Sequence, residues 1–196
     1  MRRPLVLVLC LLLSALTTAP LQAQLAAEEG RLEWRKRQGK ELDSLFAKLK
    51  ASTSEARAEG LSAKIWGLWY QSGDGGVDIM MRQARHTFRL AQHQAAVELV
   101  DEVLKIAPKY PEAWNLRAMI LFSMGRETEA VVDIKRTLAL EPRHFGALTG
   151  LTHINMLARN WSGALKALRA ALKLHPFLKN RRLLPQLEKL AKEKDL

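Results

Sequence analysis

Three prolines, Pro108, Pro142 and Pro176, lie 34 residues apart along the chain. Proline cannot continue a helix interior, and it biases the residue before it away from helical geometry, so each of the three should follow the end of a helix. A fixed period of this length is typical of proteins in which similar units stack in a row. No insertion or deletion separates the three blocks that this period defines, which are 77–110, 111–144 and 145–178.

Small and apolar residues recur with the same period. In the middle block they follow steps of three and four, first before Gly125 and again after it, which predicts two helices joined near that glycine. One such hairpin cannot bury its apolar face alone, so about three must stack to make a continuous core. The recurring positions are Ala84, Ala118 and Thr152; Ala96, Ala130 and Ala164; Val100, Ile134 and Leu168; and Leu104, Leu138 and Leu172.

The middle block resembles the tetratricopeptide repeat (TPR) family. Residues 77–178 share the 34-residue frame, and the resemblance implies an all-α fold, a right-handed α-solenoid of three TPR helical hairpins around a concave groove. A fold of this kind says much less about the partner that it binds. The aromatic, small, large apolar, glycine, alanine and proline positions of the family fall at Trp114, Ala118, Leu121, Gly125, Ala130 and Pro142.

The outer two blocks depart from that pattern. The aromatic residue becomes Met80 and Leu148, and the glycine becomes Ala91 and Arg159. In the middle block itself, Arg117 stands where the family prefers leucine. We expect these departures to change helix packing in detail and to leave the 34-residue frame intact.

The segments on either side of the repeats also read as helices. Residues 24–76 carry two apolar stripes, and Trp66 lies 34 residues before Val100, which predicts a degenerate N-terminal hairpin that ends at a turn over 73–76. Residues 24–40 are either a helix extension or a mobile arm. Segment 179–196 should hold a C-terminal capping helix over 180–194, because the last repeat would otherwise expose its apolar face. The stripes are Leu42, Leu45, Phe46 and Leu49; Leu61, Ile65, Leu68 and Trp69; and, in the cap, Leu183, Leu184, Leu187 and Leu190.

Residues 1–23 have the layout of a secretory signal peptide. Arg2 and Arg3 precede an apolar run over 5–16, and cleavage is expected after Ala23. The alternative is a membrane anchor, but the run is shorter than the roughly 20 residues that a spanning helix needs. The mature chain should therefore have no transmembrane segment.

Cleavage would also remove Cys10, the single cysteine, and would lower the formal net charge from +11 to +9. An exported chain without disulfides favours a Gram-negative periplasm. A basic surface favours acidic partners, and export makes nucleic acid the least suitable of them.

The segment Ile65-Trp66-Gly67-Leu68-Trp69, followed by Ser72-Gly73, resembles a segment of periplasmic repeat proteins of alphaproteobacteria. That resemblance implies a role in maintaining the cell envelope.

The sequence contains none of the common catalytic or cofactor-binding motifs, such as a nucleophile elbow, a zinc-binding His-Glu-x-x-His or a phosphate-binding glycine loop. The five histidines have no acidic cluster beside them. We therefore expect no catalytic residue, no metal site and no cofactor.

The concave groove is the candidate site. The resemblance implies that its inward residues come from the first helix of each hairpin, and their mixture of methionine, phenylalanine and arginine suits a partner with apolar anchors and a few acidic or carbonyl groups. Phe88 and Phe122 could equally pack between neighbouring helices. The lysine and asparagine set of a carboxylate clamp is absent, because Met81 and Arg85 occupy those places. The candidate residues are Met81, Arg85, Phe88, Arg89, Asn115, Met119, Phe122, Ser123, Thr149, His153, Met156 and Leu157.

Two functions remain open at this point. The first is a non-enzymatic periplasmic scaffold or adaptor that binds another protein or peptide and supports cell-envelope integrity or assembly. The alternative is a binder of an anionic envelope polymer or lipid. The basic C-terminal face that favours the alternative consists of Lys166, Arg169, Lys173, Lys179, Arg181 and Arg182.

Overall fold

The computed structural model describes residues 5–194, and these form helices joined by short turns. The expected basic start of the leader, Arg2 and Arg3, lies outside the described residues. Two compact units are present, residues 1–41 and residues 42–196. Helix α1 (Leu5–Lys50) runs through the expected cleavage position after Ala23, and residues 24–40 continue it. Within the described part of the chain, no helix combines the length and apolar character needed to cross a membrane.

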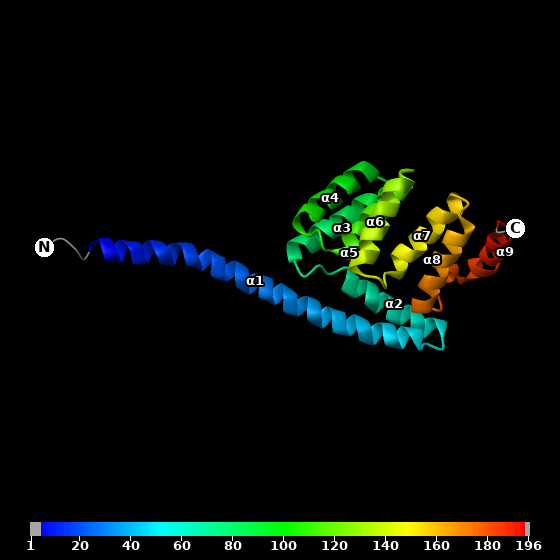
Figure 1. Ribbon diagram of the computed structural model, residues 1–196, viewed down its shortest axis with the longest axis horizontal. Coiled ribbons are helices and arrows are strands. Elements are labelled where there is room, and N and C mark those ends of the chain that lie inside the picture. Colours follow the sequence, from blue (N-terminus) through cyan, green and yellow to red (C-terminus); the bar gives the residue numbers. More distant parts are fainter. Residues whose placement is uncertain (1–4, 195–196) are drawn as a thin grey trace. The chain divides into compact units, whose positions relative to one another are not determined.

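Six helices of the second unit form three consecutive hairpins, which stand side by side in Figure 1. The alanines that recur with the 34-residue period are buried, and Ala84, Ala96 and Ala130 are fully so. The predicted all-α solenoid of three TPR hairpins is confirmed. The hairpins are α3 (Gly75–Arg89) with α4 (His93–Ile106), α5 (Pro111–Ser123) with α6 (Glu127–Leu140), and α7 (Phe145–Leu157) with α8 (Trp161–Leu174).

The turn inside each hairpin uses the same backbone conformation at the same repeat position. Gly125 has a φ of 72°, and its equivalents Ala91 and Arg159 have φ values of 58° and 52°. A left-handed residue after a helix is common, and glycine adopts it at no steric cost because it has no Cβ. The conformation is therefore set by the repeat, and the first and third hairpins adopt it without glycine.

Arg117, which replaces the family's leucine, lies between the second helices of two hairpins. Its Nε donates to Asp101 of α4 at 2.6 Å, and its Nη1 donates to both oxygens of Asp133 of α6, at 3.1 and 3.0 Å. Asp133 is only 2% exposed, and this burial raises the pKa of its carboxyl, while Arg117 acts in the opposite direction. One guanidinium thus links the first repeat to the second.

The C-terminal cap differs in detail from the single helix predicted over 180–194. A 3-10 helix η1 (Lys179–Leu183) comes first, and helix α9 (Leu184–Lys194) follows it. The expected helix is corrected in this respect, because Pro185 has no amide hydrogen and fits only in the first turn of a helix. Leu187 of α9 is fully buried in a cluster with Leu168 of α8, so the cap covers the last repeat.

The N-terminal hairpin consists of the end of α1 (residues 42–50) and α2 (Glu55–Trp69), whose N-cap Ser54 accepts a hydrogen bond from the Arg57 amide at 3.4 Å. Figure 1 shows α2 running beneath the ends of the repeat helices. Its apolar stripe, with Ile65 and Trp69, is buried together with Phe145 at the start of α7. The hairpin therefore packs across the loops that join successive repeats.

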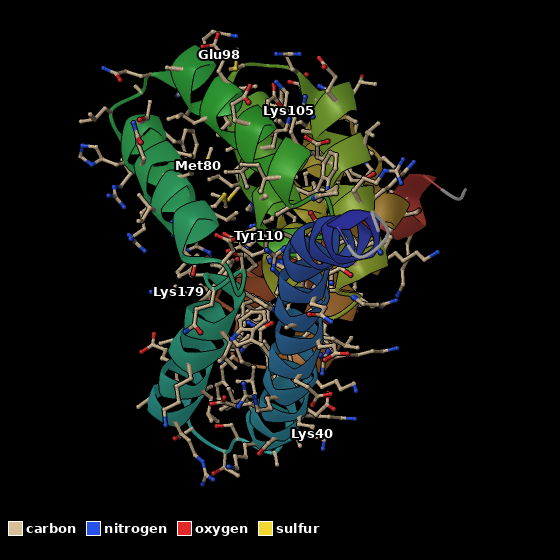
Figure 2. All side chains as sticks on the ribbon, turned by 90° about the vertical axis from the view of Figure 1, so that its left-hand side faces the viewer. Lys40, Met80, Glu98, Lys105, Tyr110 and Lys179 are labelled. Atoms are coloured by element: carbon tan, nitrogen blue, oxygen red, sulfur yellow. The ribbon has the colours of Figure 1, made fainter. Side chains whose placement is uncertain are left out.

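This crossing leaves the outer side of α3 open to solvent. Ile79 is 58% exposed, whereas Ala113, at the same position of the second repeat, is fully buried. Arg82 and His86 are also exposed, although the matching positions in α5 are buried leucine and isoleucine. In Figure 2 the outer side of the α3–α4 hairpin faces the viewer, marked by the labels of Met80 and Glu98, and α2 lies below it. The stack of repeats thus begins at α3 with a polar face, as a terminal repeat requires.

Candidate functional site

A groove with a cavity of about 440 Å³ lies along the first helices of the three hairpins. Helices α3, α5 and α7 all contribute to its lining, and the turn that precedes and begins η1 adds Leu178 and Asn180. Helix α2 contributes Ser62 and Trp66, so the N-terminal hairpin forms part of the same cavity. The volume falls within the range of about 300–1,000 Å³ that is usual for ligand pockets.

The structure brings seven of the twelve candidate residues together around this cavity. Met119 is 48% exposed, Phe88 and Phe122 are half-buried, and the two phenylalanine rings both pack against the core and line the cavity. The two rings therefore do both: they line the groove and they pack against the core between helices. The seven are Phe88, Asn115, Met119, Phe122, Ser123, Thr149 and His153.

The other five candidates lie elsewhere. Met81 is corrected, because it is fully buried in the core and cannot present its side chain to a partner. Arg85 lies over the ring of Tyr70, the C-cap residue of α2, with 4.4 Å between its guanidinium carbon and the ring centroid. Met156 packs against the cluster beneath the cap. Arg89 and Leu157 are exposed outside the cavity lining.

A buried polar network holds the edge of the groove where α2 crosses it. His144 is fully buried, and its Nδ1 accepts a hydrogen bond from the Ala147 amide at 3.1 Å, so its proton lies on Nε2. That nitrogen lies 3.2 Å from Glu112 Oε2, which also accepts from Asn115 Nδ2 at 2.9 Å. The imidazole ring stacks on Trp69 with centroids 4.1 Å apart and planes 11° apart. His144, Glu112 and Asn115 are thus joined by hydrogen bonds, whereas the buried indole nitrogen of Trp69 has no hydrogen-bond partner.

Tyr110 makes the corresponding contact one repeat earlier. Its hydroxyl donates to the carbonyl oxygen of Trp69 at 2.9 Å, and Figure 2 labels Tyr110 near the junction of α2 with the hairpin above it. Burial, followed by the negative charge of Glu112, raises the pKa of Tyr110 far above its ordinary value. The phenol therefore stays protonated and keeps donating. Tyr110 and His144 occupy the same repeat position, and Leu178 occupies it in the next unit.

The third inter-repeat loop meets the N-terminal hairpin through Phe177 and Leu178, which pack against the hairpin's apolar cluster. The ring of His175 lies edge-on to Phe145, with centroids 5.3 Å apart. Burial lowers the pKa of His175, so the imidazole is neutral at pH 7. Arg143 adds an ion pair, because its guanidinium binds Asp43 at the end of α1 as well as Glu141. The hairpin is thus attached at successive loops of the array.

Comparison with known proteins identifies the family. The chain is 32% identical over 164 residues to a TPR repeat-containing protein of Rhizobium etli, which covers 82% of this chain and 80% of the relative. The chain belongs to the TPR proteins. No protein-family model matches it.

Solved TPR structures share the fold at low sequence identity. The Sgt2 TPR domain of Aspergillus fumigatus is 17% identical with a TM-score of 0.56, and the match covers 62% of this chain and 83% of that domain. The first TPR of Spaghetti (RPAP3), bound to the HSP90 peptide SRMEEVD, is 16% identical with a TM-score of 0.55, over 61% of this chain and 94% of that one. The TPR2B domain of yeast Sti1, in a complex with pHsp70, is 21% identical with a TM-score of 0.51. That match covers 59% of this chain and 98% of the domain.

TPR proteins are generally non-enzymatic protein-interaction adaptors, and this chain has the fold of a protein–protein interaction scaffold. Among the side chains that the structure describes, no three histidine, cysteine, aspartate or glutamate groups lie together as a metal site. The groove presents apolar surface, a few amides and hydroxyls, and one exposed imidazole.

A second cleft, of about 610 Å³, lies between α8 and α9 at the end of this TPR array. Lys166, Arg169 and Lys173 line it from α8, and Lys192 and Glu188 line it from α9. Glu188 accepts a hydrogen bond from Arg169 at 2.7 Å. The three lysines therefore give the cleft lining an excess of positive charge. The structure thus groups half of the predicted basic face around one concave surface, while the other half, Lys179, Arg181 and Arg182, lies in η1.

Beyond the candidate residues, the cavity is lined by further residues of the repeats, such as Ile134 and Gly150, and by residues of the flanking segments. Ser62 and Trp66 belong to α2, and Leu178 and Asn180 belong to the turn before and at the start of η1. Leu178 and Asn180 could have been predicted from the sequence, because they lie 34 residues after His144 and Gly146. The contribution of α2 depends on a contact between distant segments, which no local pattern indicates.

Proposed function

We propose that this TPR protein is a non-enzymatic adaptor of the periplasm that binds a segment of another cell-envelope protein in its concave groove. The observation that carries the proposal is the cavity itself, which is built by the first helices of all three repeats and has apolar side chains accessible at its surface. The Spaghetti TPR structure, solved with an HSP90 peptide, supports a peptide as the kind of ligand. The leader-like sequence of residues 1–23 supports export.

Photo-crosslinking in living cells tests the adaptor function. A photoreactive amino acid at Met119, which is exposed and lines the cavity, should capture a specific envelope protein, identified by mass spectrometry. Val132 of α6 is the matched control, because it is 53% exposed and lies outside the cavity lining. Capture of the same proteins with equal yield at both positions would contradict binding in the groove.

Export and the envelope role need separate measurements. The protein isolated from a periplasmic fraction should have an intact mass that starts at Gln24, and deletion of the gene should sensitise cells to detergent. A full-length mass in the cytoplasmic fraction would contradict export. Unchanged detergent sensitivity, with export confirmed, would contradict only the envelope role.

The cleft between α8 and α9 supports the alternative function, binding of an anionic envelope polymer. Lys166, Lys173 and Lys192 surround a concave surface in which a single carboxylate, Glu188, is already paired. Binding through exposed lysines should weaken steeply with salt, because the Debye length falls to about 8 Å at 0.15 M. Dextran sulfate is a suitable probe. Affinity for it that does not change between low and physiological salt, or that survives Lys173→Glu, would contradict this function.

A further inference from the structure

We propose that α2 forms the wall of the groove that selects the occupant, and that the pocket between this wall and the repeats receives one bulky, uncharged apolar side chain of the partner. The inference rests on the proposed function, because it names the chemistry of the segment that the groove binds. It adds a binding surface that lies outside the three repeats.

The wall is held rigidly by aromatic contacts. The Trp66 ring meets Trp69, His144 and Phe145 edge-on, with centroid distances of 5.2, 5.4 and 5.6 Å. A Cβ at Gly146 would lie 2.6 Å from the edge of the same ring, so the glycine allows the indole to pass close to α7. Such contacts on several sides fix the ring before a partner arrives, and this lowers the entropy that binding costs.

The cavity is neutral as well as apolar. Its lining contains no aspartate, glutamate, lysine or arginine, and Met119, Phe122 and Phe88 face it from the repeats. A charged group entering this cavity would lose water without gaining a counter-charge, which is strongly unfavourable. An aromatic or aliphatic side chain would instead bury its surface against the rings. The acidic peptide class is therefore not the expected occupant.

The cavity lining also contains neutral polar groups that suit the backbone of a bound segment. Asn180 Nδ2 lies 3.0 Å from His153 Nε2, both side chains line the cavity, and their hydrogen bond is exposed to solvent. Amide and imidazole groups can donate to and accept from a peptide backbone without requiring a charge. The geometry thus combines an apolar pocket for one side chain with neutral partners for its main chain.

Nuclear magnetic resonance titration of the purified protein with blocked amino acids tests this chemistry. N-acetyl-tryptophanamide and N-acetyl-leucinamide should shift the amide signals of Ser62, Thr149 and Gly150, which line the cavity. N-acetyl-lysinamide and N-acetyl-glutamate amide should bind at least about tenfold more weakly, because each brings an unpaired charge. Equal shifts for the charged and apolar probes, or shifts that avoid these residues, would overturn the inference.

Two matched substitutions on α2 test the wall itself. Ser62→Glu places a charge on the cavity lining, whereas Ala63→Glu places the same charge on the exposed side of the same helix. We expect Ser62→Glu to weaken N-acetyl-tryptophanamide binding at least about tenfold and Ala63→Glu to leave it unchanged. Met119→Glu, at an exposed position of α5, provides a second charged variant that leaves α2 untouched. Loss of binding in Met119→Glu but not in Ser62→Glu would show that α2 is not the wall.

Failure of this inference and failure of the proposed function give different results. If crosslinking at Met119 captures a partner but the blocked amino acids do not bind the cavity, the adaptor function stands and the pocket chemistry is wrong. If the blocked amino acids bind as expected and no partner is captured, the adaptor function is wrong and only the pocket chemistry stands.

Discussion

The repeat hairpins and the N-terminal hairpin have the same local design but attach to their neighbours in different ways. Both are pairs of helices with apolar stripes at steps of three and four. The repeats share one buried core cluster, to which small residues at equivalent positions, such as Ala84 and Ala118, belong. The N-terminal hairpin instead crosses the inter-repeat loops through a cluster of aromatic rings that includes Trp69 and Phe145.

This difference shows that an amphipathic hairpin beside a repeat array does not have to extend it. The repeats fit one another because each presents the same surface, and their relation is therefore periodic. The N-terminal hairpin meets Tyr110 and His144, which sit at one position of the repeat, and so it contacts several units at once. A hairpin placed in this way also lines one side of the groove, through Ser62 and Trp66.

Trp69→Ala tests the crossing contact most severely. The ring of Trp69 is buried and touches Phe46, His144 and Phe145, so its removal should lower the free energy of unfolding by about 4 kcal/mol. Urea unfolding followed by circular dichroism gives this value. Trp114→Ala is the control, because that ring is only half-buried and should cost clearly less. An equal or smaller loss for Trp69→Ala would mean that the hairpin is only loosely attached.

Arg117→Ala tests the stacking contact between repeats. It leaves Asp133 buried without its counter-charge and should cost about 3 kcal/mol. The third repeat has Leu151 and Ala167 at the corresponding positions. The double variant Arg117→Leu, Asp133→Ala copies that pair and should regain most of the loss in urea unfolding. A double variant as unstable as Arg117→Ala would show that the two repeats do not stack equivalently.

A pair of glycines on α7 separates the two kinds of packing within one helix. Gly146→Ala places a Cβ 2.6 Å from the confined Trp66 ring and should destabilise the protein by about 2 kcal/mol. Gly150→Ala places a Cβ 3.5 Å from Ile134, an ordinary contact between repeats, and should stabilise it by about 0.5 kcal/mol or more. Thermal unfolding of the two variants shows whether each substitution raises or lowers the stability. Stabilisation by both substitutions would mean that Trp66 does not pack against α7.

Much of the array could be predicted from the sequence because its determinants are local and repeated. Pro108 and Pro142 follow the ends of helices, Gly125 marks a turn, and the periodic alanines are buried. Among the candidate groove residues, those that the 34-residue frame placed on α5 and α7 line the cavity more often than those it placed on α3. Met81 failed because its position points into the core in the first repeat.

The crossing of the N-terminal hairpin could not be predicted, because Trp66 meets Gly146 across 80 positions of sequence that no period links. One signal was nevertheless available. Arg82 and His86 stand where the second repeat has Leu116 and Ile120, so the outer side of α3 was already polar. A polar face there is incompatible with a fourth hairpin stacked in line, and it indicates that the hairpin must lie elsewhere.

The smallest expected effect concerns the turn that all three repeats share. Ala91 and Arg159 adopt the left-handed conformation that Gly125 adopts freely, and this costs a residue with a Cβ roughly 1–2 kcal/mol. Ala91→Gly and Arg159→Gly should each stabilise the protein by about 0.5 kcal/mol, because glycine's greater freedom in the unfolded chain offsets part of the relief. Gly125→Ala should destabilise it by about 1 kcal/mol. Thermal unfolding of the three variants gives the signs, and a loss of stability in Ala91→Gly would show that the turns are not equivalent. If the signs hold, the backbone of this turn is fixed by helix packing within each hairpin, and the residue at the position only modulates its cost.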